Sequence, residues 1–96
     1  MPTMIRYTVH ADHAARNEEL VRAVYAELAS SRPAGLRYAT FKLDDGQTFL
    51  HLADAEQDRS PLLEVAAFRA FQAGLGDRCS APPVRTAVER IGAFGW

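Results

Sequence analysis

Two histidines are the side chains of this sequence best suited to acid–base chemistry. His10 follows an apolar run in TVHAD at residues 8–12, and His51 lies inside FLHLAD at residues 49–54. Histidine titrates near neutral pH, and one in a semi-enclosed cavity could take a proton from a phenol or hydroquinone. We therefore predict His51 and His10 as candidate catalytic residues, provided that the fold brings them together.

The first histidine ends a predicted strand over residues 4–10. Apolar and polar residues alternate there with the period of two that a strand requires. One face carries Ile5, Tyr7 and Val9, and the other carries Arg6, Thr8 and His10.

The second histidine belongs to a predicted β-hairpin. Its strands are Leu36–Leu43 and Gln47–Ala53, and Asp45-Gly46 between them is a strong turn signal. A two-residue loop places these residues opposite each other: Leu43 and Thr48, Phe41 and Leu50, Ala39 and Leu52. One face of the hairpin is then largely aliphatic. The other face carries Tyr38, Thr40, Lys42, Phe49 and His51.

Two helices are predicted between these strands. The first follows Asp12, a suitable N-cap, and ends at the proline and glycine of residues 32–35. Its apolar positions recur at four-residue spacing, at Leu20, Val24 and Leu28. The second begins with Ser60 as N-cap and Pro61 at the first helical position, and runs to about Leu75, where a glycine follows.

The predicted order is strand–helix–strand, twice, with a last strand near Val84–Ile91. Right-handed, unknotted connections fold such a chain into a four-stranded antiparallel sheet with both helices on one face, the ferredoxin-like α+β arrangement βαββαβ. The length suits one domain, residues 1–96. In this prediction the first and third strands are parallel neighbours, and His10 and His51 lie roughly 5–10 Å apart on the helix-free face.

The helix-free face is predicted to be too apolar and aromatic for water alone. Besides the histidines it would carry Arg6, Thr8, Tyr38, Thr40 and Phe49. Such a patch usually marks an interface or a groove, so we predict a homodimer through this face, with a small cavity between the two sheets. In the tail IGAFGW, Phe94 and Trp96 would pack on the partner; the alternative is a frayed tail lying on its own chain.

Four segments resemble the antibiotic biosynthesis monooxygenase (ABM) group of dimeric α+β barrel proteins. They are the opening MIRYTVH, the hairpin RYATFKLDDGQTFLHLAD, the helix SPLLEVAAFRAF and the closing VERIGAF. The resemblance covers nearly the whole chain and implies a dimeric α+β barrel. It also implies a kinship with cofactor-independent oxygenases of aromatic or quinol substrates. The haem-degrading members use an asparagine on the first strand, but the only asparagine here is Asn17, in the first helix, so we expect no cofactor.

Cofactor-free oxygenation requires an electron-rich, deprotonated ring that can pass an electron to dioxygen. We predict His51 or His10 as the base, and Tyr38 and Arg6 as residues that orient the substrate and stabilise its anion. Thr40 and Phe49 complete the predicted substrate-binding set. The alternative is that both histidines only form hydrogen bonds at the dimer seam. We expect no metal site, because no HxH, HExxH or Cys/His spacing occurs.

Composition excludes several other classes of protein. The net charge is −1 with no basic stripe, which speaks against nucleic-acid binding. No apolar run approaches the ~20 residues of a membrane span, and no signal peptide precedes the first strand, so we expect a cytoplasmic protein. The single cysteine, Cys79, is expected to be a buried, inert thiol.

The sequence is compatible with two functions of different classes. The first is a cofactor-independent monooxygenase acting on a small aromatic or quinol substrate. The second is a non-catalytic module of the same dimeric fold, whose pocket holds a small apolar ligand or side chains of a partner protein. The polar face with two histidines and a tyrosine favours the first, and the missing family residues favour the second.

Overall fold

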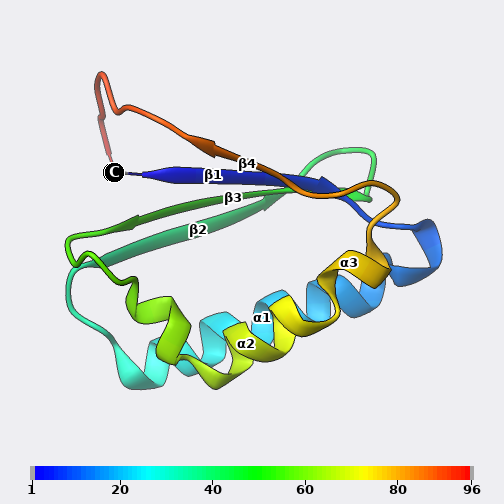
Figure 1. The fold of residues 1–96 in the computed structure, drawn as a ribbon, viewed down its shortest axis with the longest axis horizontal. Coiled ribbons are helices and arrows are strands. Elements are labelled where there is room, and N and C mark those ends of the chain that lie inside the picture. The colour runs from blue at the N-terminus through cyan, green and yellow to red at the C-terminus, as the bar shows by residue number, and fades with distance from the viewer. Residues whose placement is uncertain (1, 96) are drawn as a thin grey trace.

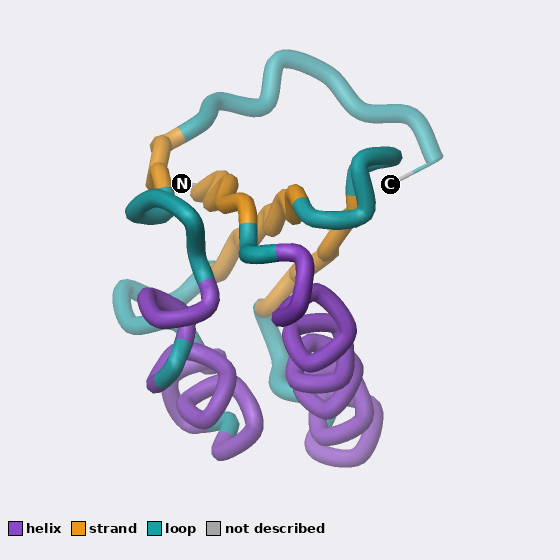
Figure 2. Tube along the Cα trace, turned by 90° about the vertical axis from the view of Figure 1, so that its right-hand side faces the viewer, coloured by secondary structure: helices purple, strands orange, loops and turns teal. Residues whose placement is uncertain are grey.

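The computed structural model describes residues 2–95 and has the predicted βαββαβ order. Helices α1, α2 and α3 lie on one side of the sheet, whose strand order is β2-β3-β1-β4 with every neighbouring pair antiparallel (Figures 1 and 2). The elements are β1 (Thr3–Thr8), η1 (Ala11–His13), α1 (Ala14–Ser31), β2 (Leu36–Lys42), β3 (Thr48–Ala55), η2 (Pro61–Glu64), α2 (Ala66–Ala73), α3 (Leu75–Arg78) and β4 (Val84–Ala87).

The β2–β3 hairpin has the predicted register. Phe41 pairs with Leu50 and Ala39 with Leu52, and the Leu43 amide donates to the Thr48 carbonyl at 2.8 Å. The Asp45 carboxylate holds the turn by accepting the backbone N–H groups of Gln47 and Thr48, and Gly46 has a positive φ of 72°. A local turn with strong chemistry therefore fixed the pairing of the whole hairpin.

The predicted parallel pairing of β1 and β3 is wrong. The crossover through α1 makes β1 and β2 run the same way, and the hairpin then reverses β3, so β1 and β3 are antiparallel. His51 pairs with Ile5, and Thr48 with Thr8. His10 follows the far end of β1, five positions beyond Ile5, which is about 16 Å at the rise of a strand.

The prediction of which hairpin face the helices cover is also wrong. Tyr7 pairs with Phe49 and Ile5 with His51, and cross-strand partners share a face. Because Tyr7 and Phe49 belong to the core beneath the helices, His51 lies there too, and only 3% of it is exposed. Tyr38 and Thr40 share that face, whereas Ala39, Phe41, Leu50 and Leu52 form part of the helix-free face.

Helix α1 buries a stripe of Asn17, Val21 and Val24 against the sheet. The predicted N-cap role of Asp12 is wrong, because the turn η1 precedes the helix and His13 occupies its N-cap position. The helix ends at Arg32, which adopts a left-handed conformation and donates its N–H to the Leu28 carbonyl.

The second predicted helix starts as expected but is broken into three pieces. The Ser60 hydroxyl accepts the Leu62 N–H, and Pro61 is the first residue of η2. Val65 is extended and separates η2 from α2, and the predicted stop after Leu75 is wrong because α3 continues to Arg78. The Glu27 carboxylate of α1 accepts the first N–H groups of α2, so a tertiary contact caps this helix.

The last strand is shorter than predicted and covers only Val84–Ala87. Its partner β1 begins at Thr3, which pairs with Ala87, so no strand remains for later residues to pair with. The tail leaves the sheet on the side opposite the helices (Figures 1 and 2), and Ile91 and Phe94 are 97% and 98% exposed. Trp96 lies outside the described residues.

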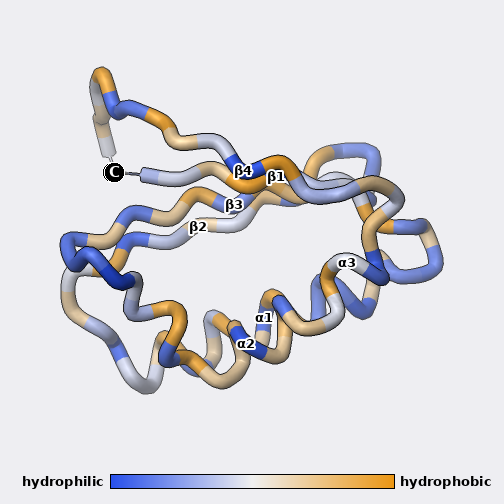
Figure 3. The backbone as a smooth tube through the Cα atoms, in the orientation of Figure 1, coloured by the Kyte–Doolittle hydropathy of each residue, from blue (hydrophilic) through white to orange (hydrophobic). Residues whose placement is uncertain are grey.

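The core lies between the sheet and the helices, and the loops at both ends of the sheet are hydrophilic (Figure 3). It consists of Tyr7, Val9, Val21, Val24, Phe49, Leu62, Val65, Phe68, Phe71 and Cys79. The predicted burial of the Cys79 thiol is thereby confirmed. Across residues 2–95 we find no helix with the length and apolarity of a membrane span.

Candidate functional site

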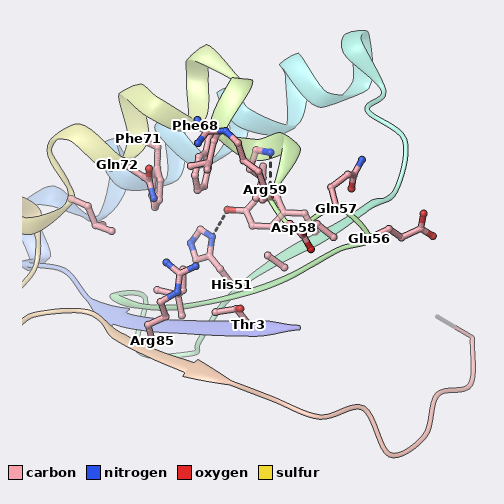
Figure 4. Close-up of a pocket in the computed structure, with 18 of the residues that line it drawn as sticks. Thr3, His51, Glu56, Gln57, Asp58, Arg59, Phe68, Phe71, Gln72 and Arg85 are labelled. Carbon is pink, nitrogen blue, oxygen red and sulfur yellow. Dashed lines mark hydrogen bonds between the residues drawn. The ribbon is translucent and has the colours of Figure 1, made fainter. Parts of the chain in front are cut away.

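A cavity of about 750 Å³ lies between the helix-facing side of the sheet and the η2–α2 segment. This volume is within the ~300–1,000 Å³ of small-molecule sites. Figure 4 shows His51 within this cavity, with Phe68 and Phe71 on its helical side. Its apolar lining includes Ile5, Leu62, Leu63, Phe68, Phe71 and Leu75, and its polar lining includes Glu56, Gln57, Asp58, Arg59, Gln72 and Arg85.

His51 is the centre of a buried hydrogen-bond network. Its Nε2 is 2.8 Å from the Tyr7 Oη, and its Nδ1 is 2.5 Å from the Tyr38 Oη. The Thr40 Oγ1 lies 3.2 Å from the same Nδ1 and 2.7 Å from the Tyr25 Oη. Both ring nitrogens therefore have hydroxyl partners, and His51, Tyr7 and Tyr38 all line the cavity.

The network continues away from the cavity to α1 and α3. The Asn17 amide Nδ2 donates to the Tyr7 Oη at 3.0 Å, and the Arg78 Nε donates to the Asn17 Oδ1 at 3.1 Å. Arg78 also donates to the Phe71 carbonyl at 2.8 Å, and its guanidinium lies 5.3 Å from the centre of the Phe71 ring. We call Arg78, Asn17, Tyr7, His51 and Tyr38 the buried polar chain.

Burial determines the charges in this network. It lowers the pKa of His51 to about 4, so the imidazole is neutral at physiological pH. It raises the pKa values of Tyr7 and Tyr38, which therefore keep their protons. Arg78 supplies a positive charge at the inner end, and among the described residues no carboxylate is paired with it. The cavity thus meets a neutral imidazole and neutral hydroxyls.

The predicted site residues fall into separate places. His51 and Tyr38 line the cavity and contact each other. Thr40 lies behind them, and Phe49, 1% exposed, stacks on Tyr7 in the core.

The other two predicted residues lie outside the cavity. Arg6 is exposed on the opposite face of the sheet, and His10 is exposed beside η1, its ring 6.0 Å from that of His13. The predicted juxtaposition of His10 and His51 is therefore wrong, because the antiparallel register sends them to different places. A catalytic role for His10 stays an untested prediction.

Three members of the buried polar chain were not assigned a role from the sequence: Tyr7, Asn17 and Arg78. The burial of Asn17 could have been predicted from its spacing in the sequence. With Val21, Val24 and Leu28 it forms an i, i+4, i+7, i+11 stripe, so an amide occupies a core position of an amphipathic helix. A buried amide needs hydrogen-bond partners, which points to a polar site beneath the helix. Arg78 left no such signal, because its burial depends on the path of α3.

Comparison with solved structures identifies the class of fold as the dimeric α+β barrel of the ABM structures, which confirms the fold expected from the resemblance. A provisionally assigned antibiotic biosynthesis monooxygenase from Nitrosomonas europaea matches with a TM-score of 0.76 at 16% identity, over 95% of this chain and 98% of that chain. A second antibiotic biosynthesis monooxygenase structure has a TM-score of 0.73 at 10% identity, over 95% and 98% of the two chains.

A variant of SnoaB, a cofactor-independent oxygenase from Streptomyces nogalater, has a TM-score of 0.63 at 17% identity, over 93% of this chain and 92% of SnoaB. No protein-family model matches the sequence, and no curated protein matches it. At these identities the likeness concerns the fold.

Proposed function

We propose that this protein is a cofactor-independent monooxygenase that oxidises a small aromatic or quinol-type substrate in the cavity between the sheet and η2–α2. One observation carries the proposal: the hydrogen-bonded Tyr38–His51 pair lines a cavity of about 750 Å³ whose other walls include the rings of Phe68 and Phe71. Aromatic walls suit a flat ring, and the polar pair suits its hydroxyl oxygen. The likeness of the fold to SnoaB supports the same reaction class.

In such a reaction the deprotonated ring passes one electron to dioxygen. The superoxide and the ring radical then combine to form a carbon–oxygen bond, and the resulting hydroperoxide loses water. One oxygen atom remains on the ring as a carbonyl, and the other leaves in water together with the ring hydrogen and the substrate proton. The protein must bind the ring, favour its anion and keep bulk water away.

The site favours the substrate anion more easily than it could accept the substrate proton. His51 has a pKa of about 4, whereas an ordinary phenol has a pKa near ~10, so direct transfer to His51 would cost about 8 kcal/mol. Hydrogen bonds to the phenolate oxygen act in the opposite direction, because they stabilise the charged form. In this proposal Tyr38 stabilises the anion, His51 supports Tyr38 through their hydrogen bond, and the proton leaves to water at the cavity mouth.

Oxygen uptake with a panel of naphthols and hydroquinones under air tests this function. We expect the wild-type protein to consume oxygen with at least one of them, and Tyr38→Phe to lower kcat by about 10²-fold, because one preorganised donor is lost. His51→Phe should act in the same direction. No uptake by the wild-type protein across the panel would contradict the proposal.

His13→Ala is the matched control, since His13 lies at the N-cap of α1, outside the residues that line the cavity. Its oxygen uptake should equal that of the wild type. His10→Ala examines the untested prediction of a catalytic role for His10. Loss of uptake in this variant, at unchanged stability, would bring His10 back into the reaction.

A second candidate, a non-catalytic binding module, is favoured by the same network. Both nitrogens of His51 are occupied by protein hydroxyls, and its low pKa makes it a poor base. In that case naphthols and naphthoquinones should bind in the cavity, as seen by calorimetry, with no oxygen consumed. Binding that is lost in Phe68→Ala and in Phe71→Ala, without turnover in the wild type, would favour this candidate.

We also propose that two copies associate through the helix-free face of the sheet. By the strand register this face carries the apolar residues Met4, Ala39, Phe41, Leu50, Leu52 and Val84 and the polar residues Arg6, Thr8, Arg37, Thr48, Asp54 and Thr86. Val84 is 61% exposed, and the tail, which includes the exposed residues Ile91 and Phe94, runs on the same side of the sheet (Figure 1). Apolar surface of this kind supports a partner subunit. The cavity lies on the other face, so the substrate site does not depend on this contact.

A further inference from the structure

The hydrogen bonds of the buried polar chain have a fixed donor-to-acceptor order, and Arg78 at its inner end sets this order. An arginine side chain has only donors, so the Arg78 Nε must face the carbonyl oxygen of Asn17. The Asn17 Nδ2 then points at Tyr7 and donates to its oxygen, at 3.0 Å. The Asn17 amide therefore has this orientation, because a flipped amide would place its Nδ2 donor against the Arg78 Nε donor.

The direction passes from Tyr7 to His51. The Tyr7 oxygen accepts from Asn17, and its own hydrogen needs an acceptor, because the hydroxyl is buried with only 3% of the residue exposed. The acceptor within reach is the His51 Nε2, at 2.8 Å. Nε2 therefore carries a lone pair, and the proton of the neutral imidazole lies on Nδ1.

The last hydrogen bond in this order joins His51 to Tyr38 at the cavity. The Nδ1–H donates to the Tyr38 oxygen at 2.5 Å, and Thr40 next to it already has Tyr25 as a partner at 2.7 Å. The Tyr38 hydroxyl has accepted one hydrogen bond and has its own hydrogen to give, for which a ligand oxygen in the cavity would compete with Thr40, the other side chain that hydrogen-bonds Tyr38. We propose that Arg78, Asn17 and Tyr7 act as positioning residues that hold His51 as its Nδ1–H tautomer, so that Tyr38 is a hydrogen-bond donor to an acceptor oxygen of the ligand.

This polarity defines the class of ligand. A site that ends in a donor binds a phenolate or a quinone carbonyl better than a neutral phenol that must donate. Arg85 adds to the preference: it extends from β4 into the cavity on the His51 side (Figure 4), and the described residues offer it no ion pair. The ligand class rests on the proposed site, whereas the tautomer does not depend on any turnover.

Nitrogen-15 NMR of histidine-labelled protein tests the tautomer directly. The chain has three histidines, and the His51 signals are identified by their loss in His51→Gln. We expect Nδ1 of His51 at the position of a protonated ring nitrogen and Nε2 at that of an unprotonated one, at neutral pH. A dominant Nε2–H form in the wild-type protein would overturn the proposal, whatever the variants do.

Asn17→Asp should reverse the donor-to-acceptor order of the hydrogen bonds in the buried polar chain, with almost no change in the shape of the side chain. A carboxylate has only acceptors, so it would take the Arg78 donor and also the Tyr7 hydrogen. Tyr7 would then accept from Nε2–H, Nδ1 would accept from Tyr38, and the tautomer would switch. Ala23→Asp, an exposed position on the same helix, is the control for the added charge and should leave the tautomer unchanged. An unchanged His51 tautomer in folded Asn17→Asp would refute the proposal that Arg78, Asn17 and Tyr7 set the tautomer.

Binding of 4-nitrophenol tests the ligand class, because its ionised form has a distinct absorption. The wild-type protein should bind the phenolate about tenfold more tightly than the phenol, which is a fall of about one unit in the pKa of the bound probe. The preference for the phenolate should shrink in Tyr7→Phe, which removes the hydroxyl that connects Asn17 to His51 and adds no charge. No binding, or a preference for the neutral phenol, would overturn the ligand assignment. A correct tautomer without oxygen uptake would contradict the proposed function alone.

Discussion

The burial of His51 makes the stability of the fold depend on pH. Its pKa is about 4 when folded, against ~6.5 when unfolded, so between these values only the unfolded chain binds the proton. Stability is therefore complete above pH ~6.5 and falls as the pH drops towards 4. Around the ring, Tyr7 and Tyr38 stay uncharged. The cations on this side of the sheet include Arg78, at the inner end of the buried polar chain, and Arg85, which lines the cavity with His51.

We predict that acid between pH 6.5 and 4 removes up to about 3 kcal/mol of stability through His51 alone. Urea unfolding at several pH values, for the wild type and for His51→Gln, measures this contribution. The two stability curves should converge as the pH falls, because the variant lacks the titrating group. Parallel curves over that range would contradict the low pKa.

Arg78 is a buried cation that is held by neutral acceptors. Arg78→Met keeps much of the packing on Phe71 but leaves the Asn17 Oδ1 and the Phe71 carbonyl without this donor. We expect a loss of about 2–3 kcal/mol, because each buried acceptor loses its partner. Chemical unfolding gives the value. Arg22→Met is the control, since Arg22 pairs with Glu18 at the surface and should matter little.

At the scale of elements, the hairpin was predictable and the covered face was not. The Asp45-Gly46 turn and the alternating pattern of the strands fix the register by local chemistry alone. Both faces are comparably apolar, however, and Tyr38 and His51 looked like members of an exposed polar face. Their polar atoms are in fact satisfied by each other and by Tyr7, 44 positions from His51, which no local pattern reveals.

The broken second helix has the same kind of cause. Val65 interrupts it, and α2 restarts where the Glu27 carboxylate accepts the N–H groups of Ala66 and Ala67 at 3.1 and 3.0 Å. We predict that Glu27→Ala lowers the free energy of unfolding by about 1–2 kcal/mol and Glu27→Gln by less, because glutamine retains one acceptor. Urea midpoints measure both variants. Glu19→Ala, on the exposed side of α1, should have little effect.

At the scale of the whole molecule, the two faces of the sheet differ in what covers them and in the side chains they present. The helix-covered face encloses the cavity and the buried polar chain, and the helix-free face presents apolar side chains of all four strands. This division corrects the sequence-based picture, in which one face both bound the substrate and formed the dimer. Dimerisation and the chemistry of the cavity should therefore be separable by mutation.

We predict a particle of about twice 10.6 kDa in sedimentation at micromolar concentration. Leu50→Glu and Val84→Glu place charges on the helix-free face and should give monomers, because unpaired charges are costly in an apolar interface. Ala70→Glu, exposed on α2 and far from that face, should remain dimeric. Monomeric Val84→Glu should keep the Nδ1–H tautomer of His51, since the network that sets it lies wholly within one chain. A wild-type protein that sediments only as a monomer would disprove the interface and leave the cavity intact.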